Sequence, residues 1–232
     1  MLRVLAMLLR WAAVPPLALL ALALWSELWR ASRLAGLGPA SLLHPLGLAF
    51  AGGLVFRLAW AAGLRRLGRH DPLDFLDTLE HELTHALAGY LTLCPPLSLS
   101  ATLKSGGEVQ LKGANPIAAL APYFLPLWCL GVMLLGLVIR PGMQQAWNAL
   151  LLFLLGVFAY RLGREYRWRQ SDLHRYGFLF STLLVLGLLP LVLGLLLHAR
   201  GLLSGHWLGG VLPHAWDSLQ AALGWLKRGK PA

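Results

Sequence analysis

Stretches of about 20 apolar residues recur along this chain, and each is long enough to cross the hydrocarbon core of a bilayer. The chain has 232 residues, of which 57% are hydrophobic, and its mean hydropathy is +0.63, a composition unusual for a soluble domain. A helix satisfies its own backbone hydrogen bonds in lipid. We therefore predict an all-α polytopic membrane protein in contact with a lipid bilayer. We expect a multi-pass protein of the bacterial inner (cell) membrane.

Six segments have the pattern of membrane helices. We expect these helices at about 11–29, 41–64, 72–93, 115–139, 145–160 and 171–198. The N-terminal sequence 1–25 resembles a signal peptide, but Arg10 lies inside its first apolar run and it has no clear cleavage site, so we expect a retained span. Pro190 is expected to kink the last helix. We divide the chain into two N-terminal transmembrane helices (1–70), a core (71–198) and a C-terminal tail (199–232).

Between the third and fourth segments, apolar residues alternate with polar ones in "LSLSATLKSGGEVQLKG". This period of two, with Gly106 and Gly107 between the two runs, predicts a β-hairpin over about 97–112; a solvated loop is the alternative. An isolated hairpin is marginal in water, so we expect it to pack against the helices or the membrane. In the tail, an apolar stripe indicates an amphipathic helix lying in the membrane interface: Leu212, Trp216, Leu219, Leu223 and Leu226.

The formal net charge of +10 raises the question of a nucleic-acid partner. Most of the Lys and Arg residues, however, cluster at the ends of apolar runs, where they suit anchoring at lipid headgroups. We expect no nucleic-acid partner.

The third segment contains the sequence "TLEHELTHAL" and most of the acidic cluster of the chain. Of ten acidic residues, five fall within positions 71–82: Asp71, Asp74, Asp77, Glu80 and Glu82. A helix places His81 and His85 on one face, one turn apart, where both imidazoles can bind one metal ion. Glu82 lies beside them. This is the H-E-x-x-H pattern, in which zinc lowers the pKa of a water molecule and the glutamate acts as general base.

The other acidic residues of this segment have simpler interpretations. Asp77, one turn before His81, either orients that imidazole or is solvated. Asp71 and Asp74 suit the N-terminal end of the helix dipole. Glu80 is expected to point away from the histidines, toward an arginine such as Arg57.

A catalytic zinc usually has three protein ligands, so a third must come from elsewhere in the chain. Asp172, in "RQSDLHRYG" at the start of the last segment, is the expected ligand. The alternatives are that Asp172 caps that helix or pairs with Arg169 or Arg175. His174 is the second candidate for the ligand and Glu165 the third.

Three features together resemble the site-2 protease family of intramembrane zinc metalloproteases. They are "HELTH" at 81–85 in an apolar helix, the hairpin sequence "SGGEVQLKG", and an Asp at the head of a later helix, Asp172. The resemblance covers about 72–198. One departure is Leu173, since a Gly usually follows the Asp in this family.

The resemblance implies hydrolysis of peptide bonds in a membrane-protein substrate, expected to be single-pass. Zinc is then held by His81, His85 and Asp172, and Glu82 activates the water. The hairpin, with Gly106 and Gly107, would hold an unwound substrate by strand addition. Asn115 would bind the substrate backbone or stabilise the oxyanion, or else cap the fourth helix.

Two other classes of protein remain open. One is a different membrane metalloprotease with a downstream Glu ligand, either Glu108 or Glu165. The other is a non-catalytic membrane scaffold or transporter that binds a metal or protons. An intact Glu82 speaks against the second class, because a metal site alone does not need the base.

Overall fold

The computed structural model describes residues 2–34, 45–68, 71–102, 106–113, 115–138, 141–168, 170–202, 213 and 220. The expected amphipathic helix of the tail therefore lies outside the described residues. The chain divides into two compact units, Met1–Gly38 with Gly177–Ala232, and Pro39–Tyr176. The boundaries at 70 and 198 drawn from the sequence stay predictions.

The first unit contains two long apolar helices, α1 (Leu2–Leu34) and α8 (Phe178–Ala199). They pack through small and branched side chains. A buried cluster of Ala23, Leu24, Leu28 and Ala31 on α1 meets Leu191, Leu193 and Leu197 of α8. Pro190 lies inside α8, as the sequence indicates.

In the second unit, α2 (Pro45–Arg66) and α6 (Gln144–Glu165) cross at very short range. A Cβ atom at Gly53 would lie 1.9 Å from the carbonyl oxygen of Phe153, and one at Gly156 would lie 2.1 Å from that of Phe50. The two glycines therefore permit backbone contact between the helices, in the way that small residues do in membrane helix pairs.

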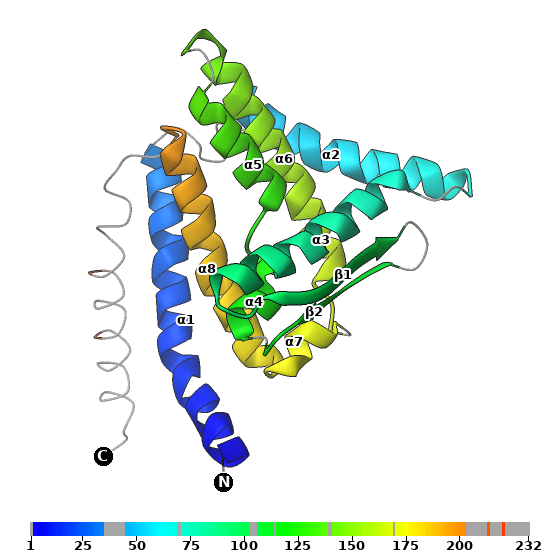
Figure 1. Cartoon of the computed structure of the whole chain (residues 1–232). Helices are drawn as coiled ribbons and strands as arrows, with labels where there is room; N and C mark the ends of the chain where they lie inside the picture. The colour runs from blue at the N-terminus through cyan, green and yellow to red at the C-terminus, as the bar shows by residue number, and fades with distance from the viewer. Residues whose placement is uncertain are drawn as a thin grey trace. The chain divides into compact units, whose positions relative to one another are not determined.

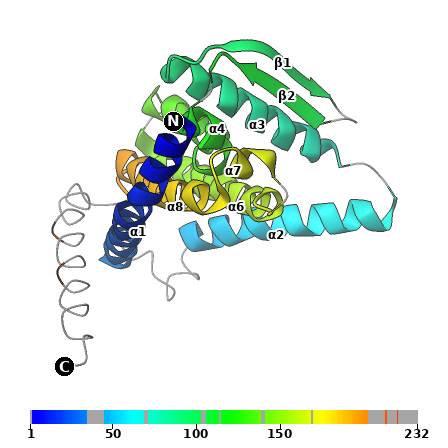
Figure 2. The ribbon, with the colours of Figure 1, turned by 90° about the horizontal axis from the view of Figure 1, so that it is seen from below.

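The third predicted helix is α3 (Pro72–Leu91). Asp71 is its N-cap and accepts a hydrogen bond from the backbone N–H of Leu73, while Pro72 takes the first helical position, where no N–H is needed. The α3 helix contains the HELTH sequence and lies between the β-hairpin and helices α2 and α6 (Figure 2).

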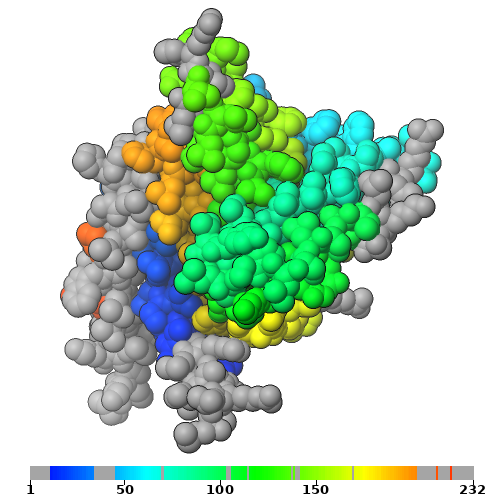
Figure 3. Space-filling view, viewed as in Figure 1, coloured from blue at the N-terminus to red at the C-terminus, as the bar shows by residue number. Residues whose placement is uncertain are grey.

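The predicted hairpin is confirmed as β1 (Pro96–Thr102) paired antiparallel with β2 (Gly106–Leu111), with Leu99 opposite Val109. Both strands pack along α3 (Figure 1), and in the space-filling view the hairpin and α3 form one continuous surface (Figure 3). The prediction that the hairpin leans on a helix is thus confirmed.

The fourth predicted helix is broken. It consists of α4 (Pro116–Leu120), a 3₁₀ turn (Ala121–Tyr123) and α5 (Leu127–Leu135), and the two halves are bent by 79°. The physical reason is Pro126, which has no N–H to donate within a continuous helix. The carbonyl oxygen of Pro122 accepts instead from Nη2 of Arg161, at 3.3 Å.

The sixth predicted helix is also two helices, α7 (Ser171–Arg175) and α8. Between them Gly177 has a φ of +94°, a backbone conformation that a helix cannot continue through. The short α7 belongs to the second unit, Pro39–Tyr176.

Four described helices are long and apolar enough to cross a membrane: Trp11–Arg33 within α1, and α2, α6 and α8. The bent pair of α4 and α5 would make a fifth if it were one span. A mainly helical, membrane-type fold with a small sheet is thus confirmed, but the expected number of six spans is not. The helix missing from the set is α3, which carries the acidic cluster.

Candidate metal centre

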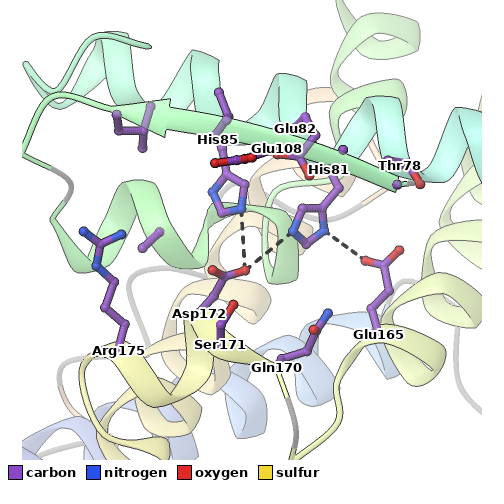
Figure 4. A pocket seen from close by; sticks show the side chains of 15 residues that line it. Thr78, His81, Glu82, His85, Glu108, Glu165, Gln170, Ser171, Asp172 and Arg175 are labelled. Atoms are coloured by element: carbon purple, nitrogen blue, oxygen red, sulfur yellow. Dashed lines mark hydrogen bonds and ion pairs between the residues drawn. The ribbon is translucent and has the colours of Figure 1, made fainter. Parts of the chain in front are cut away.

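The α3 helix presents His81 and His85 on one face, as their spacing of four residues predicts. Their ring centroids lie 4.8 Å apart, and the side chains are only 12% and 8% exposed. Asp172, on α7, faces both rings: its Oδ2 lies 3.7 Å from Nε2 of His81 and 3.7 Å from Nε2 of His85 (Figure 4). Ligand atoms of these three residues all lie within 4.8 Å of one another.

Hydrogen bonds on the far side of each ring decide which nitrogen faces Asp172. Nδ1 of His85 lies 2.9 Å from the carbonyl oxygen of Ala118. A carbonyl oxygen only accepts, so this nitrogen carries the hydrogen, and in the neutral ring Nε2 keeps its lone pair. Nδ1 of His81 lies 3.1 Å from Oε2 of Glu165, with the same consequence when that carboxylate is ionised. Two imidazole nitrogens and one carboxylate oxygen thus converge, a donor set that fits a zinc ion with an open position.

Asp172 lies beside the two histidines, where it could serve as a third ligand, and not at the cap of α7. The N-cap of α7 is Gln170, so the alternative that Asp172 caps this helix is wrong. Burial by itself would raise the pKa of Asp172, but the two imidazoles outweigh it and hold this pKa well below its usual range. The hydroxyl of Tyr123 donates to Oδ2 of Asp172 at 3.5 Å. Asp172 therefore stays ionised and is oriented toward the histidines.

The two other candidates for the third ligand lie elsewhere. The ring of His174 is exposed, with Nε2 at the carbonyl oxygen of Trp168. Glu165 contacts His81, but at Nδ1, on the opposite side of the ring from Asp172. Of the described residues, the group that could hold a metal ion is His81, His85 and Asp172.

These residues line a cavity of about 380 Å³ whose walls are α3, β2 and α7 (Figure 4). Glu82 is in its wall and is 8% exposed. Burial raises the pKa of Glu82, and the nearby carboxylates Asp172 and Glu108 raise it further, against the opposing effect of the two histidines. Gly106 and Gly107 line the same cavity.

Asn115 has a structural role in this fold. Its Oδ1 accepts from the backbone N–H of Ala118 at 2.9 Å, so it caps α4, the structural role among the three considered for it. Its Nδ2 donates to the carbonyl oxygen of Thr92 at 3.4 Å. Asn115 is not one of the residues that line the cavity.

The remaining carboxylates of α3 pair with arginines of the apolar helices. Asp77 does not contact His81: its Oδ2 binds Nη2 of Arg57 at 2.7 Å and Nη2 of Arg164 at 3.3 Å, so neither interpretation offered for it is right. Glu80 pairs with Arg161 at 2.8 Å and not with Arg57. The expected pair of Glu80 with Arg57 is wrong because the guanidinium of Arg57 lies at the N-terminal end of α3, where it binds aspartates that precede Glu80.

Arg57 also binds the two carboxylates at the start of α3. Its Nη1 lies 2.5 Å from Asp71 and its Nη2 lies 3.0 Å from Asp74. These two residues therefore form ion pairs in addition to facing the helix dipole.

Sequence reasoning considered Glu165 only as a ligand and not as a partner of His81, and it missed Tyr123 as a neighbour of Asp172. One signal was available, because ionisable residues inside an apolar helix are costly unless they have partners. Arg161, Arg164 and Glu165 lie on one face of α6, at a spacing of three and four residues. Together with Arg57 they are the natural partners of a helix as acidic as α3.

In comparisons with protein-family models, with curated proteins and with solved structures, none matches the chain.

Proposed function

We propose that the chain is a membrane-embedded zinc metalloendopeptidase of the site-2 protease type, which hydrolyses peptide bonds of membrane-protein substrates. One observation carries the proposal. Nε2 of His81, Nε2 of His85 and Oδ2 of Asp172 converge in a cavity that also contains the carboxylate of Glu82. Two histidines of α3 and a carboxylate of α7, with the carboxylate of Glu82 beside them, suit a hydrolytic metal site better than a storage site.

His81, His85 and Asp172 would hold the zinc ion. When bound, zinc supplies Lewis-acid chemistry, lowering the pKa of a water molecule and polarising a carbonyl group. Glu82 accepts a proton from the attacking water at its carboxylate and passes it to the leaving amine. Its raised pKa suits this exchange, because a group is an efficient general acid and base when its pKa approaches the working pH.

The β2 strand is suited to hold the substrate. It pairs with β1 along one edge, and in the described part of the chain no third strand covers the other. Five residues of β2 line the cavity, and none of β1 does: Gly106, Gly107, Glu108, Val109 and Leu111. A substrate segment added to β2 would be extended and would pass the metal ligands. A helical segment could not pair with β2 in this way, because its backbone groups are already hydrogen-bonded to one another.

The membrane arrangement belongs to the same proposal. We place the protein as a multi-pass protein of a bacterial inner membrane, with a single-pass protein as substrate. The three acidic ion-pair partners of Arg57 and the one of Arg161 make it possible for α3, polar as it is, to lie against the apolar helices α2 and α6.

Purified full-length protein tests the proposal. It is expected to bind about one zinc ion per chain, a stoichiometry set by one group of three ligands. Glu82→Gln is expected to keep zinc and lose cleavage. Comparison of membrane proteomes from cells with the unchanged protein and with Glu82→Gln should show a single-pass protein that accumulates uncut. Zinc binding with identical proteomes would favour the non-catalytic scaffold.

A further inference from the structure

Glu165 has no part in the proposed reaction, yet it faces a metal ligand. Its Oε2 lies 3.1 Å from Nδ1 of His81, while Nε2 of the same ring faces Asp172 (Figure 4). The two nitrogens of an imidazole point in diverging directions, so Glu165 cannot share an ion with Nε2. We infer that Glu165 is a positioning residue, which holds the His81 ring with Nε2 toward the metal and strengthens that nitrogen as a ligand.

The two histidines differ in what supports them. Nδ1 of His85 is held by a backbone carbonyl, that of Ala118, whereas Nδ1 of His81 is held by a carboxylate. Both partners orient a ring, but an ionised carboxylate also adds negative charge, which makes the imidazole a stronger metal ligand. Of the two histidines, His81 is therefore the one whose strength as a ligand depends on another side chain.

Glu165 is the last residue of α6, which is an unfavourable place for a carboxylate. The C-terminal end of a helix carries partial negative charge and favours cations. Within α6, Oε1 of Glu165 lies 3.9 Å from Nη2 of Arg164, a long and partly exposed contact that contributes little to stability. The stability of α6 is therefore a weak reason for a glutamate there. Its side chain is 16% exposed and that of His81 is 12% exposed, so water screens their contact only in part.

Two arginines fix α6 against α3 so that Glu165 reaches His81. Nη1 of Arg161 lies 2.8 Å from Glu80, and Nη2 of Arg164 lies 3.3 Å from Asp77. One face of α6 carries Arg161, Arg164 and Glu165. On α3, their partners lie close to His81 in sequence, since Asp77 is one turn before it and Glu80 directly precedes it. The position of α6 along α3 thus brings the carboxylate of Glu165 to Nδ1 of His81.

The inference rests on the proposed metal site and is tested by zinc affinity. The full-length protein and Glu165→Gln are purified in detergent, and a chelating dye competes for Zn²⁺. The glutamine can still accept the hydrogen bond from Nδ1, but it carries no charge. We expect zinc binding to weaken by roughly 10–100-fold, as for other residues that support a ligand. X-ray absorption should show the same number of protein ligands in both proteins.

Glu108→Gln is the matched control. Glu108 lines the same cavity from β2, and its Oε1 accepts from Gln110 at 3.3 Å rather than from a histidine. The control removes the same charge from the cavity but leaves the partners of both histidines in place. It should therefore leave zinc affinity close to that of the unchanged protein. If Glu165→Gln does not fold, Glu165→Asp replaces it, because the shorter side chain withdraws the carboxylate from Nδ1 and should also weaken binding.

Each outcome has a definite meaning. Equal zinc affinities for the Glu165 variant and the Glu108 control would overturn the inference. Loss of a ligand in the X-ray absorption spectrum would also overturn it, and would make Glu165 a ligand. If the unchanged protein binds zinc through Asp172 and is indifferent to Glu165, only this inference fails. If it binds no zinc, the proposed function fails as well.

Discussion

Gly107 of β2 lies directly against the side chain of Glu82. A Cβ atom at position 107 would stand 2.5 Å from Cγ of Glu82 and 2.9 Å from Cγ2 of Thr78, closer than carbon atoms pack. Because glycine has no Cβ, the backbone of β2 can pass Glu82 at this distance. The edge of the strand and the acidic side chain therefore border the same part of the cavity.

Gly107→Ala is expected to displace Glu82 or β2 and to slow cleavage by roughly 10²-fold, the cost of misplacing a reacting group by about 1 Å. Zinc content should stay unchanged, because none of the three atoms nearest to the added methyl belongs to a metal ligand. The measurement is the rate of cleavage of the membrane substrate, together with zinc per chain. Gly63→Ala is the control, since a Cβ there meets nothing within 4 Å. Equal rates for both variants would show that β2 and Glu82 are not in contact.

Asp172→Ala is expected to weaken zinc binding by more than the ~10–100-fold typical of a residue that only supports a ligand. The reason is that Oδ2 of Asp172 is the one oxygen that faces both Nε2 atoms among the described residues. His174→Ala is the matched control on the same short helix, because its ring faces Trp168 instead. Competition with a chelating dye measures both. Loss of zinc in the His174 variant, with the Asp172 variant unaffected, would reverse the assignment.

Zinc affinity is expected to rise with pH. Burial by itself would lower the pKa of His81, but Asp172 and Glu165 outweigh burial and raise this pKa to about 9 in the metal-free protein. Zinc binds only the neutral imidazole, so below pH 9 the ion must displace a proton. Affinity should therefore increase roughly tenfold per pH unit from neutral pH up to about pH 9 and then level off.

Isothermal titration calorimetry checks this prediction. Near neutral pH, the apparent binding enthalpy should change with the ionisation enthalpy of the buffer, by an amount that corresponds to about one released proton. The same titration at a pH above 9 should show little dependence on the buffer. A buffer-independent enthalpy at both pH values would mean that His81 is already neutral.

The features that sequence predicts well here are local. The α3 helix is predicted from its own residues, because Asp71 supplies the cap, Pro72 the first position and the two histidines their spacing. The hairpin is predicted from its period of two and its glycines. The break at Pro126 is also local, but it escapes notice because the residues on both sides of it are apolar and are typical of one continuous span. The break at Gly177 escapes notice because the polar residues before it, such as Asp172, also suit the first turns of one longer helix.

The partner of His81 depends instead on how helices cross. Glu165 is 84 residues away in the sequence, and it reaches His81 only because α6 crosses α2 at Gly53 and Gly156 and meets α3 with its charged face. Asp172 was identified through a resemblance to a family and through the scarcity of acidic residues, rather than through spacing. Pairings between ionic residues of different helices were the least predictable part, as Asp77 and Glu80 show.

The ion pair between Arg161 and Glu80 is expected to be critical for stability. Their side chains are 1% and 5% exposed, and Nη1 of Arg161 lies 2.8 Å from Oε2 of Glu80. Arg161→Met leaves the Glu80 carboxylate buried without its cation, which should cost ~3–5 kcal/mol of unfolding free energy. Arg161→Met combined with Glu80→Gln should recover part of that loss, because the amide oxygen can still accept from the backbone N–H of Trp128.

Arg164→Met is the control for this pair, and denaturant unfolding in detergent measures all three variants. Arg164 has three acidic partners: Asp74 is 49% exposed, Asp77 keeps Arg57 at 2.7 Å, and Glu165 lies 3.9 Å from Nη2 of Arg164. Exposed pairs contribute about 0–1 kcal/mol, so this variant should lose little stability. The contrary result would be that Arg161→Met is no more destabilising than Arg164→Met. The carboxylate of Glu80 would then have to be neutral or hydrated in the folded protein, and the ion pairs of Arg164 with Asp74 and Asp77 would be the ones that hold α6 against α3.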